Sequence, residues 1–258
     1  MLAAVVSATT VGAETAREIL DRRKHLEETE RHWDDREQRL VLEIHGSRGG
    51  ERRRELVVYE RRLDDDERQS ILFFEAPAEV RGTGFLSFSH PDRAADQWLY
   101  LPALKRIRQI TAQTRKESFV GTDLSYHDLD ILQDIGEWTE EDAASSLLGE
   151  EKVGGVATYA IELRPKRADV DYERIQLWLG RDDLVSRRTR FFDDQDDPVK
   201  EIDQSDIRMV GAIPVPHRVE VARPRRGSHT VMTIERVRFD QELEADLFTQ
   251  RALEMGER

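Results

Sequence analysis

Most of the chain alternates hydrophobic and polar positions in short runs, the pattern of β-strands that bury one face. The run at 40–45 is an example, because Leu40, Leu42 and Ile44 fall on one side of an extended chain. Comparable runs, closed by turns rich in glycine, aspartate or proline, follow at 52–62, 69–75, 153–163, 174–180, 184–192, 199–209, 212–222 and 229–239. Their spacing predicts one large antiparallel sheet or barrel.

Two segments follow a helical pattern instead. Residues 14–33 carry a narrow apolar stripe beside a charged face, which predicts one helix that can pack on one surface only. Simple packing and the covering of a cavity explain this stripe equally well. A second, short helix is expected to begin near Tyr126, where Asp123 or Ser125 can cap it.

The stretch 73–128 is the most distinctive part of the chain. Its three apolar runs end at Pro77, Pro91 and Pro102, where a missing backbone N–H costs a sheet least. After Ile110 the alternation stops, and a polar basic segment, TAQTRKES, leads into FVGTDLSYHDL. We therefore expect strands up to Ile110 and a structured loop after it.

This stretch contains four motifs in a fixed order. They are F-x-x-P (Phe74–Pro77) before Arg81-Gly82-Thr83, D-x-W-L-Y-L-P (96–102), the basic residues Lys105, Arg106 and Arg108, and S-F-x-G-T-D-x-S-Y-x-D-L (118–129). Together they resemble the LolA-like outer-membrane lipoprotein-sorting family. Two positions depart from that pattern, since Leu124 stands where an aromatic residue is usual and His127 where an acid is usual.

The resemblance implies an α+β fold: a strongly curved antiparallel sheet, an incomplete β-barrel of the LolA/LolB kind, with helices covering its concave face. It implies a periplasmic carrier, without enzymatic activity or a cofactor. Such a carrier binds a lipid or lipoprotein acyl chain in an apolar cavity and moves it toward the outer membrane. Proteins that resemble this one also look like partners of inner-membrane exporters of the resistance-nodulation-division (RND) type.

Charge and composition exclude several classes of partner and of chemical site. The 258 residues include 40 basic and 53 acidic side chains, a net charge of −13, which disfavours nucleic acid and permanent attachment to anionic lipid headgroups. We expect a monomer that contacts membranes only transiently. The chain has no cysteine, which excludes disulfides, thiolate metal sites and cysteine nucleophiles.

The first 13 residues are small to apolar and end in Val11-Gly12-Ala13, which resembles a signal-peptide cleavage site. A signal peptide also carries a basic segment before its apolar part, and residues 1–13 contain no basic side chain. We therefore interpret 1–13 as a truncated signal peptide whose basic part lies upstream of Met1; an ordinary N-terminus is the alternative. Residues 14–258 contain no linker rich in glycine, proline or serine, so we predict one domain there. The resemblance implies that this domain is a carrier in the periplasm of a Gram-negative bacterium.

Candidate site residues come from the distinctive stretch. For the apolar cavity we predict large apolar and aromatic side chains, namely Phe85, Trp98, Tyr100, Phe119, Leu124 and Tyr126, and for its polar end Arg106 and Arg115. In a filled core the aromatic residues would pack only on each other, and the arginines can equally protect a strand edge.

Two other functions remain open. One is an accessory or scaffold protein of an exporter with a filled core. The other is a hydrolase or metal enzyme that uses Tyr126, His127 and Asp128, which a tight polar cluster around His127 inside a cleft would favour. No nucleophile elbow of the form GxSxG is present, so we expect no catalysis. Zinc at His25 and His32 would need a third ligand such as Glu28, and we interpret these residues as surface residues and expect no bound metal.

Overall fold

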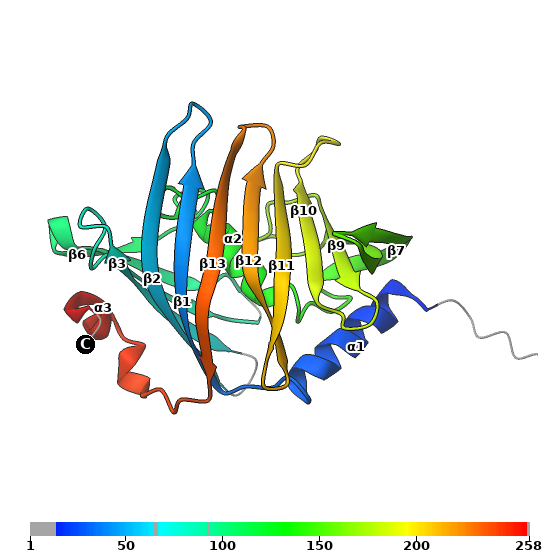
Figure 1. The fold of residues 1–258 in the computed structure, drawn as a ribbon, viewed down its shortest axis with the longest axis horizontal. Helices are drawn as coiled ribbons and strands as arrows, with labels where there is room; N and C mark the ends of the chain where they lie inside the picture. The colour runs from blue at the N-terminus through cyan, green and yellow to red at the C-terminus, as the bar shows by residue number, and fades with distance from the viewer. Residues whose placement is uncertain (1–13, 64–66, 92, 257–258) are drawn as a thin grey trace, which may run out of the picture.

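The computed structural model describes residues 14–63, 67–91 and 93–256 (Figure 1), and the predicted signal peptide at 1–13 lies outside the described residues. The strands are β1 (Asp35–His45), β2 (Glu51–Arg62), β3 (Arg68–Ala76), β4 (Gly84–Ser89), β5 (Asp96–Leu101), β6 (Arg106–Ile110), β7 (Ala143–Val153), β8 (Val156–Pro165), β9 (Arg174–Gly180), β10 (Ser186–Phe192), β11 (Lys200–Val210), β12 (Ile213–Arg223) and β13 (Ser228–Phe239). In the described part of the chain they form one 13-stranded antiparallel sheet.

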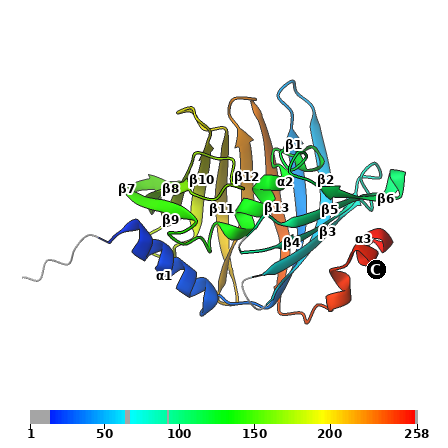
Figure 2. The ribbon, with the colours of Figure 1, turned by 180° about the vertical axis from the view of Figure 1, so that it is seen from behind.

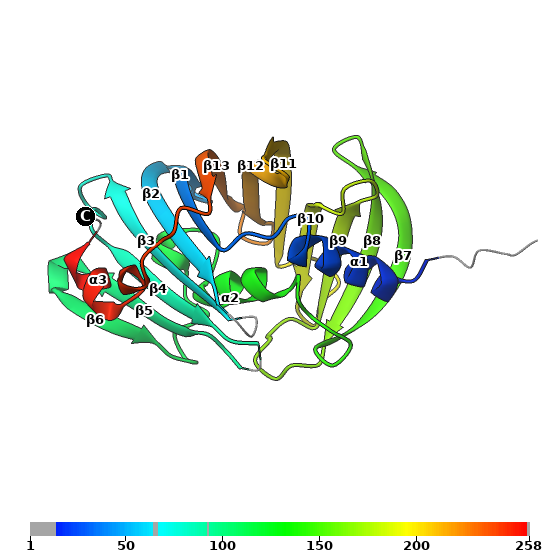
Figure 3. The same cartoon turned by 90° about the horizontal axis from the view of Figure 1, so that it is seen from below.

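The sheet is built from two wings that meet at its centre. Its spatial order is β6-β5-β4-β3-β2-β1-β13-β12-β11-β10-β9-β8-β7, so β1 pairs with β13, and β6 and β7 form the two edges. Seen from below, the sheet curves around α2 without joining its edges (Figure 3). The prediction of an incomplete barrel is therefore confirmed.

Irregular pairing accompanies the curvature. The register shifts between β1 and β13 at Arg39/Leu40, between β2 and β3 at Glu55/Leu56, between β7 and β8 at Leu147/Gly149, and between β9 and β10 at Ser186/Arg188. Bulges of this kind bend a strand and increase its twist, which allows a wide sheet to curl.

In the part of the chain that the structure describes, three α-helices accompany the sheet: α1 (Ala16–Glu28), α2 (Tyr126–Asp134) and α3 (Gln250–Met255). The predicted first helix exists but ends at Glu28, earlier than expected. It starts at a capping box between Thr15 and Glu18, and it buries Ile19 and Leu20. Among the described residues, no helix combines the length and apolar character needed to cross a bilayer.

The helices do not all cover the same face. From behind, α2 lies across the inside of the sheet and α1 lies at the β7 side (Figure 2). The C-terminal residues Phe248 and Leu253 instead pack on the opposite face, where Val57, Phe73 and other side chains of β2–β4 form a separate core. Gly84 permits this approach, because a Cβ there would lie 2.7 Å from Leu253 Cδ1.

Candidate functional site

The motif at 118–129 forms a plug at one end of the concave face. Its first part is a 3₁₀ turn, η3 (Phe119–Gly121), in which Val120 and Gly121 have positive φ angles of 45° and 77°. The carbonyl oxygens of this turn accept hydrogen bonds from two arginines of β2: Arg54 binds the oxygen of Val120, and Arg52 Nη2 lies 3.1 Å from that of Gly121. The turn is thereby fixed to β2.

Asp123 fixes the same plug to the centre of the sheet. Its carboxylate accepts hydrogen bonds from Ser228 Oγ at 2.5 Å and from Thr230 Oγ1 at 2.7 Å, both on β13. Its own backbone N–H donates to Thr230 Oγ1 at 3.1 Å. The side chain expected as a possible helix cap thus anchors the loop, and Ser125 is the residue that caps α2.

Asp128 anchors α2 itself and is fully buried. It forms an ion pair with Lys200 of β11, and Tyr172 Oη donates to its Oδ1 at 2.5 Å. Burial alone would raise the pKa of Asp128, but the Lys200 ammonium and the hydrogen bonds from Tyr172 and Ser125 hold it below its usual value. Burial lowers the pKa of Lys200 and, with the Asp128 charge, raises that of Tyr172 well above 10.

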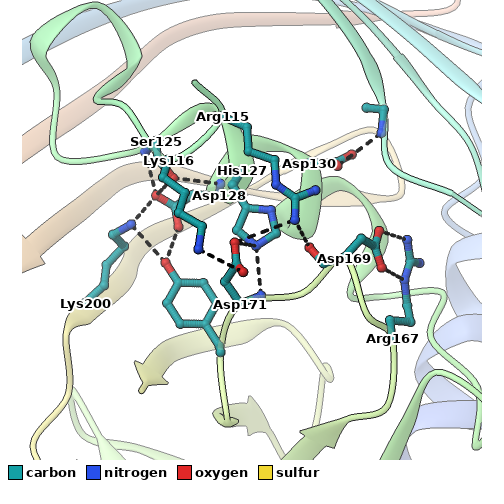
Figure 4. Close-up of polar contacts among 12 residues, drawn as sticks. Arg115, Lys116, Ser125, His127, Asp128, Asp130, Arg167, Asp169, Asp171 and Lys200 are labelled. Carbon is teal, nitrogen blue, oxygen red and sulfur yellow. Dashed lines mark hydrogen bonds and ion pairs between the residues drawn. The ribbon is translucent and has the colours of Figure 1, made fainter. Parts of the chain in front are cut away.

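His127 lies beside this pair and faces the 166–173 loop (Figure 4). Its Nε2 accepts a hydrogen bond from the backbone N–H of Asp171 at 3.2 Å, and its ring stacks on Tyr172. Burial and, to a smaller extent, the Arg115 guanidinium lower the pKa of His127 to about 4. The imidazole is therefore neutral at pH 7.

The polar cluster does not have the geometry of a nucleophilic site. Ser125 Oγ donates to Asp128 at 2.7 Å, so the hydroxyl is directed to the carboxylate and away from a histidine base. The side chains of His127, Asp128 and Lys200 are 5%, 0% and 6% exposed. These contacts tie α2 to β11 and to the 166–173 loop, and a substrate has no direct access to them.

A cavity of about 180 Å³ lies between α2, the plug and the concave face. Ten of its 16 lining residues are apolar: Leu40, Leu42, Leu56, Val58, Leu72, Phe85, Phe119, Leu124, Leu129 and Met232. The six polar ones are Gln38, Glu60, Ser70, Thr122, Gln133 and Thr230. Strands β1–β4 and β13 supply the wall, and α2 with the plug supplies the cover.

Four of the predicted apolar residues gather at this cavity. Phe85, Phe119 and Tyr126 form a buried triangle with ring centroids 5.3–5.6 Å apart. Phe85, Phe119 and Leu124 line the cavity directly, and Tyr126 packs behind them. Whether they bind a ligand stays a prediction.

Trp98 and Tyr100 do not belong to that group, which corrects the expectation that all six residues share one surface. In the ladder of β4 and β5, Phe85 pairs with Leu99, so Leu99 faces the interior and its neighbours face the other way. Trp98 and Tyr100 pack with the core under α3. The motif D-x-W-L-Y-L-P supplies both faces of β5, and only one of them reaches the cavity.

The predicted polar end is also divided. Arg106 is exposed at the start of edge strand β6. Arg115 belongs to the polar cluster, where its Nη2 donates to the carbonyl oxygen of Asp169 at 2.7 Å and lies 3.6 Å from the Asp171 carboxylate. Neither arginine lines the cavity.

Sequence reasoning missed the partners of Asp128 and most of the cavity wall. Strand alternation placed Leu40 and Leu42 on one face of their strand, and the same argument could have identified Leu56 and Leu72 as cavity-facing. Nothing in the local sequence of Lys200 or Tyr172 indicates that they meet Asp128, because sheet topology alone brings these elements together.

Comparisons with known proteins support this description. A family model described only as that of an uncharacterized protein matches residues 66–255. The comparison with curated proteins found no match.

Three solved structures are similar over almost the whole chain. They are a domain assigned to the outer membrane lipoprotein-sorting proteins from Vibrio parahaemolyticus (24% identity, 93% of this chain and 98% of that one, TM-score 0.83), a DUF1329 family protein from Desulfovibrio piger (28%, 93% and 100%, 0.84) and a LolA superfamily protein from Nitrosomonas europaea (16%, 93% and 100%, 0.69). These similarities confirm the LolA-like fold that the resemblance implied.

Proposed function

Because the fold is similar to those of lipoprotein-sorting and LolA superfamily proteins, we propose that the protein is a carrier for an acyl chain of a lipid or lipoprotein. In this proposal the carrier works in the periplasm of a Gram-negative bacterium, performs no chemistry and moves its cargo toward the outer membrane. An inner-membrane exporter of the RND type is its proposed partner. The cavity between α2 and the concave face is the binding site.

The observation that carries this proposal is the leucine-rich cavity itself. An apolar cavity of about 150 Å³ in another protein stays free of water and takes up a small apolar molecule. The cavity here is of similar size, at about 180 Å³, and ten of its 16 lining residues are apolar. It is smaller than the roughly 300–1,000 Å³ of most small-molecule sites. In its present shape the cavity therefore accepts only part of one acyl chain. A longer acyl chain requires the cover formed by α2 and the plug to move.

Transfer would follow from differences in apolar burial. Each methylene removed from water contributes about 0.8 kcal/mol, so a chain moves to whichever protein or membrane buries more of it. The cover is fixed at the plug and at Asp128, as described above. Movement of the opposite end of α2 would therefore change the cavity volume at the smallest cost.

An exporter accessory protein with a filled core is the second candidate. One observation favours it: apolar side chains fill the core that the wing of β8–β12 shares with α1. There Ile161, Leu177 and Phe191 are fully buried and pack in the same core as Ile19 of α1. If the cavity beneath α2 in the other wing remains empty in the cell, the fold serves as a scaffold.

A cavity-filling substitution tests the carrier. Val58→Phe places a ring in the cavity from β2, whereas Val156→Phe makes the same change at a position 38% exposed. We expect native mass spectrometry of protein purified from the periplasm to show a bound lipid in the wild type and in Val156→Phe, and its loss in Val58→Phe. A well-folded wild type that carries no lipid and takes up no added alkane or acylglycerol would reject the carrier in favour of the scaffold.

A further inference from the structure

The cavity is polar at one end and apolar at the other. Along β1 its lining residues are Gln38, Leu40 and Leu42, and along β2, which runs antiparallel, they are Glu60, Val58 and Leu56. Ser70 of β3 pairs with Glu60, so the polar side chains of three strands lie at the same end. We call the end formed by Gln38, Glu60, Ser70 and Gln133 the polar end, and the end formed by Leu42, Met232 and Phe119 the apolar end.

The polar atoms near the apolar end are already satisfied by the protein. Thr122 Oγ1 donates to the carbonyl oxygen of Phe119 at 2.8 Å, and Thr230 Oγ1 donates to Asp123. Their hydrogen-bonding capacity holds the plug in place. A ligand therefore meets mainly methyl, methylene and aromatic groups there.

The polar end differs because one of its groups has no partner. The side-chain amide of Gln38 makes no hydrogen bond to any described residue, although it lines the cavity. Ser70 Oγ accepts a long hydrogen bond of 3.3 Å from Gln133 Nε2. An amide offers two N–H donors and a carbonyl acceptor, so Gln38 can bind either a donor or an acceptor on a ligand.

The charges at this end disfavour an anion. Glu60 is the single ionic residue that lines the cavity in the described chain, and it is 8% exposed. The Arg36 guanidinium, its partner, donates Nε–H to Glu60 Oε2 at 2.8 Å. The residues that line the cavity in the described chain include no lysine or arginine, so a carboxylate or phosphate seated beside Gln38 would lose its hydration and lie next to Glu60.

The polar end is also the end that reaches the rim of the sheet. One step further along β2 and β3, Arg62 pairs with Arg68, and both border a second, solvent-open pocket of about 250 Å³. Arg68 Nη1 donates to the carbonyl oxygen of Gln133 at 2.9 Å, which places that rim directly beside the cavity. The opposite, apolar end is closed by the plug.

We propose that the cavity holds a single-chain amphiphile in one orientation, its tail toward Leu42, Met232 and Phe119 and an uncharged hydrogen-bonding head beside Gln38 and Ser70. Hydroxyl and amide groups are the head chemistry that fits, and the ligand enters tail first from the rim at Arg62 and Arg68. This inference rests on the proposed function, because it specifies the ligand of the same cavity.

Three probes of equal chain length test the head preference: monododecanoylglycerol, dodecanoate and dodecane, titrated by calorimetry into the full chain after delipidation. We expect the glycerol ester to bind at least tenfold more tightly than dodecanoate. Gln38→Leu should weaken the ester about tenfold, the usual effect of one lost hydrogen bond of this kind, and leave dodecane unchanged. Gln109→Leu makes the same change at an exposed position of β6 and should alter neither probe.

A second variant addresses the charge. Glu60→Gln removes the one carboxylate from the cavity wall and should narrow the gap between dodecanoate and the ester. Tighter binding of dodecanoate than of the ester by the wild type, or an equal effect of Gln38→Leu on the ester and on dodecane, overturns the orientation and leaves the carrier intact. If none of the three probes binds the wild type, the carrier itself fails.

Discussion

The two ends of α2 are attached to the sheet in different ways. At the N-terminal end, Asp128 is buried with Lys200 and Tyr172, and Asp123 binds β13. At the C-terminal end, Arg68 donates from Nη1 to the carbonyl oxygen of Gln133 at 2.9 Å and also forms an ion pair of 2.6 Å with Glu137, just beyond the helix; the side chains of Arg68 and Glu137 are 19% and 22% exposed. The charged contacts of one end are thus buried, and those of the other end are partly exposed.

This difference determines how the cavity can change. Breaking a buried pair leaves an uncompensated charge, whereas a partly exposed pair can be replaced by water at small cost. The cavity has its apolar end under the strong attachment and its polar end under the weak one. The predictions below separate the two ends, beginning with the largest expected effect.

Lys200→Met should be the most damaging single change. It leaves the Asp128 carboxylate buried without its cation, and we expect the free energy of unfolding to fall by about 3–5 kcal/mol in urea titrations followed by circular dichroism. Adding Asp128→Asn removes the stranded charge and keeps an acceptor for the Ser125 cap, so the double variant should recover part of the loss. A loss below about 1 kcal/mol would show that the N-terminal end is no stronger than the other.

Acid should weaken the same end through His127. Its pKa is about 4 in the folded protein against 6.5 for an unperturbed histidine, so between these values only the unfolded chain takes up the proton. Stability therefore falls as the pH is lowered from 6.5 to 4, by about 3 kcal/mol in all. Asp128 titrates below this window, because its pKa lies under 3.8.

Urea titrations between pH 7 and pH 4 test this sign and size. His127→Gln should flatten the dependence in that window, and His25→Gln, at an exposed position of α1, should leave it unchanged. An unchanged slope in His127→Gln would mean that His127 does not control the stability of this end.

Arg68→Gln should have the smallest effect on stability, about 1 kcal/mol, because its ion pair is partly solvated. Its effect on motion should be clearer: hydrogen exchange followed by mass spectrometry should become faster near Gln133 and remain slow near Tyr126. Arg106→Gln, which removes an exposed charge from β6, serves as the control and should change neither measurement. Equal acceleration along the whole of α2 would remove the distinction between its ends.

Local sequence patterns were sufficient for most of the strands and for the start of α2, but they did not predict the edge strand β7. Alternation in 40–45 correctly predicted a strand with Leu40 and Leu42 on one face, and the cap of α2 is Ser125, one of the two residues expected there. Both depend on residues close in sequence. The recognisable motif at 118–129 also led to the plug, since nearly every residue in it that the family pattern specifies makes an anchoring contact.

Long-range placement could not be predicted in the same way. Trp98 and Tyr100 were assigned to the cavity because they are aromatic, but register turns them toward a core completed by Leu253, far along the chain. The partners of Asp128 come from β11 and from the loop before β9. Alternation defines two faces of a strand, and the covering of each face depends on elements that alternation does not describe.

The pairing of β1 with β13 has a consequence for how the molecule forms. Each wing is a meander whose contacts are local and close quickly, whereas the central seam joins the beginning of the sheet to its end and carries the full entropic cost of that long loop. Met232 completes the cavity wall from the last strand. During synthesis the first wing therefore exists for a time with its apolar face exposed to solvent. In that period, chaperones or rapid folding must protect it from aggregation.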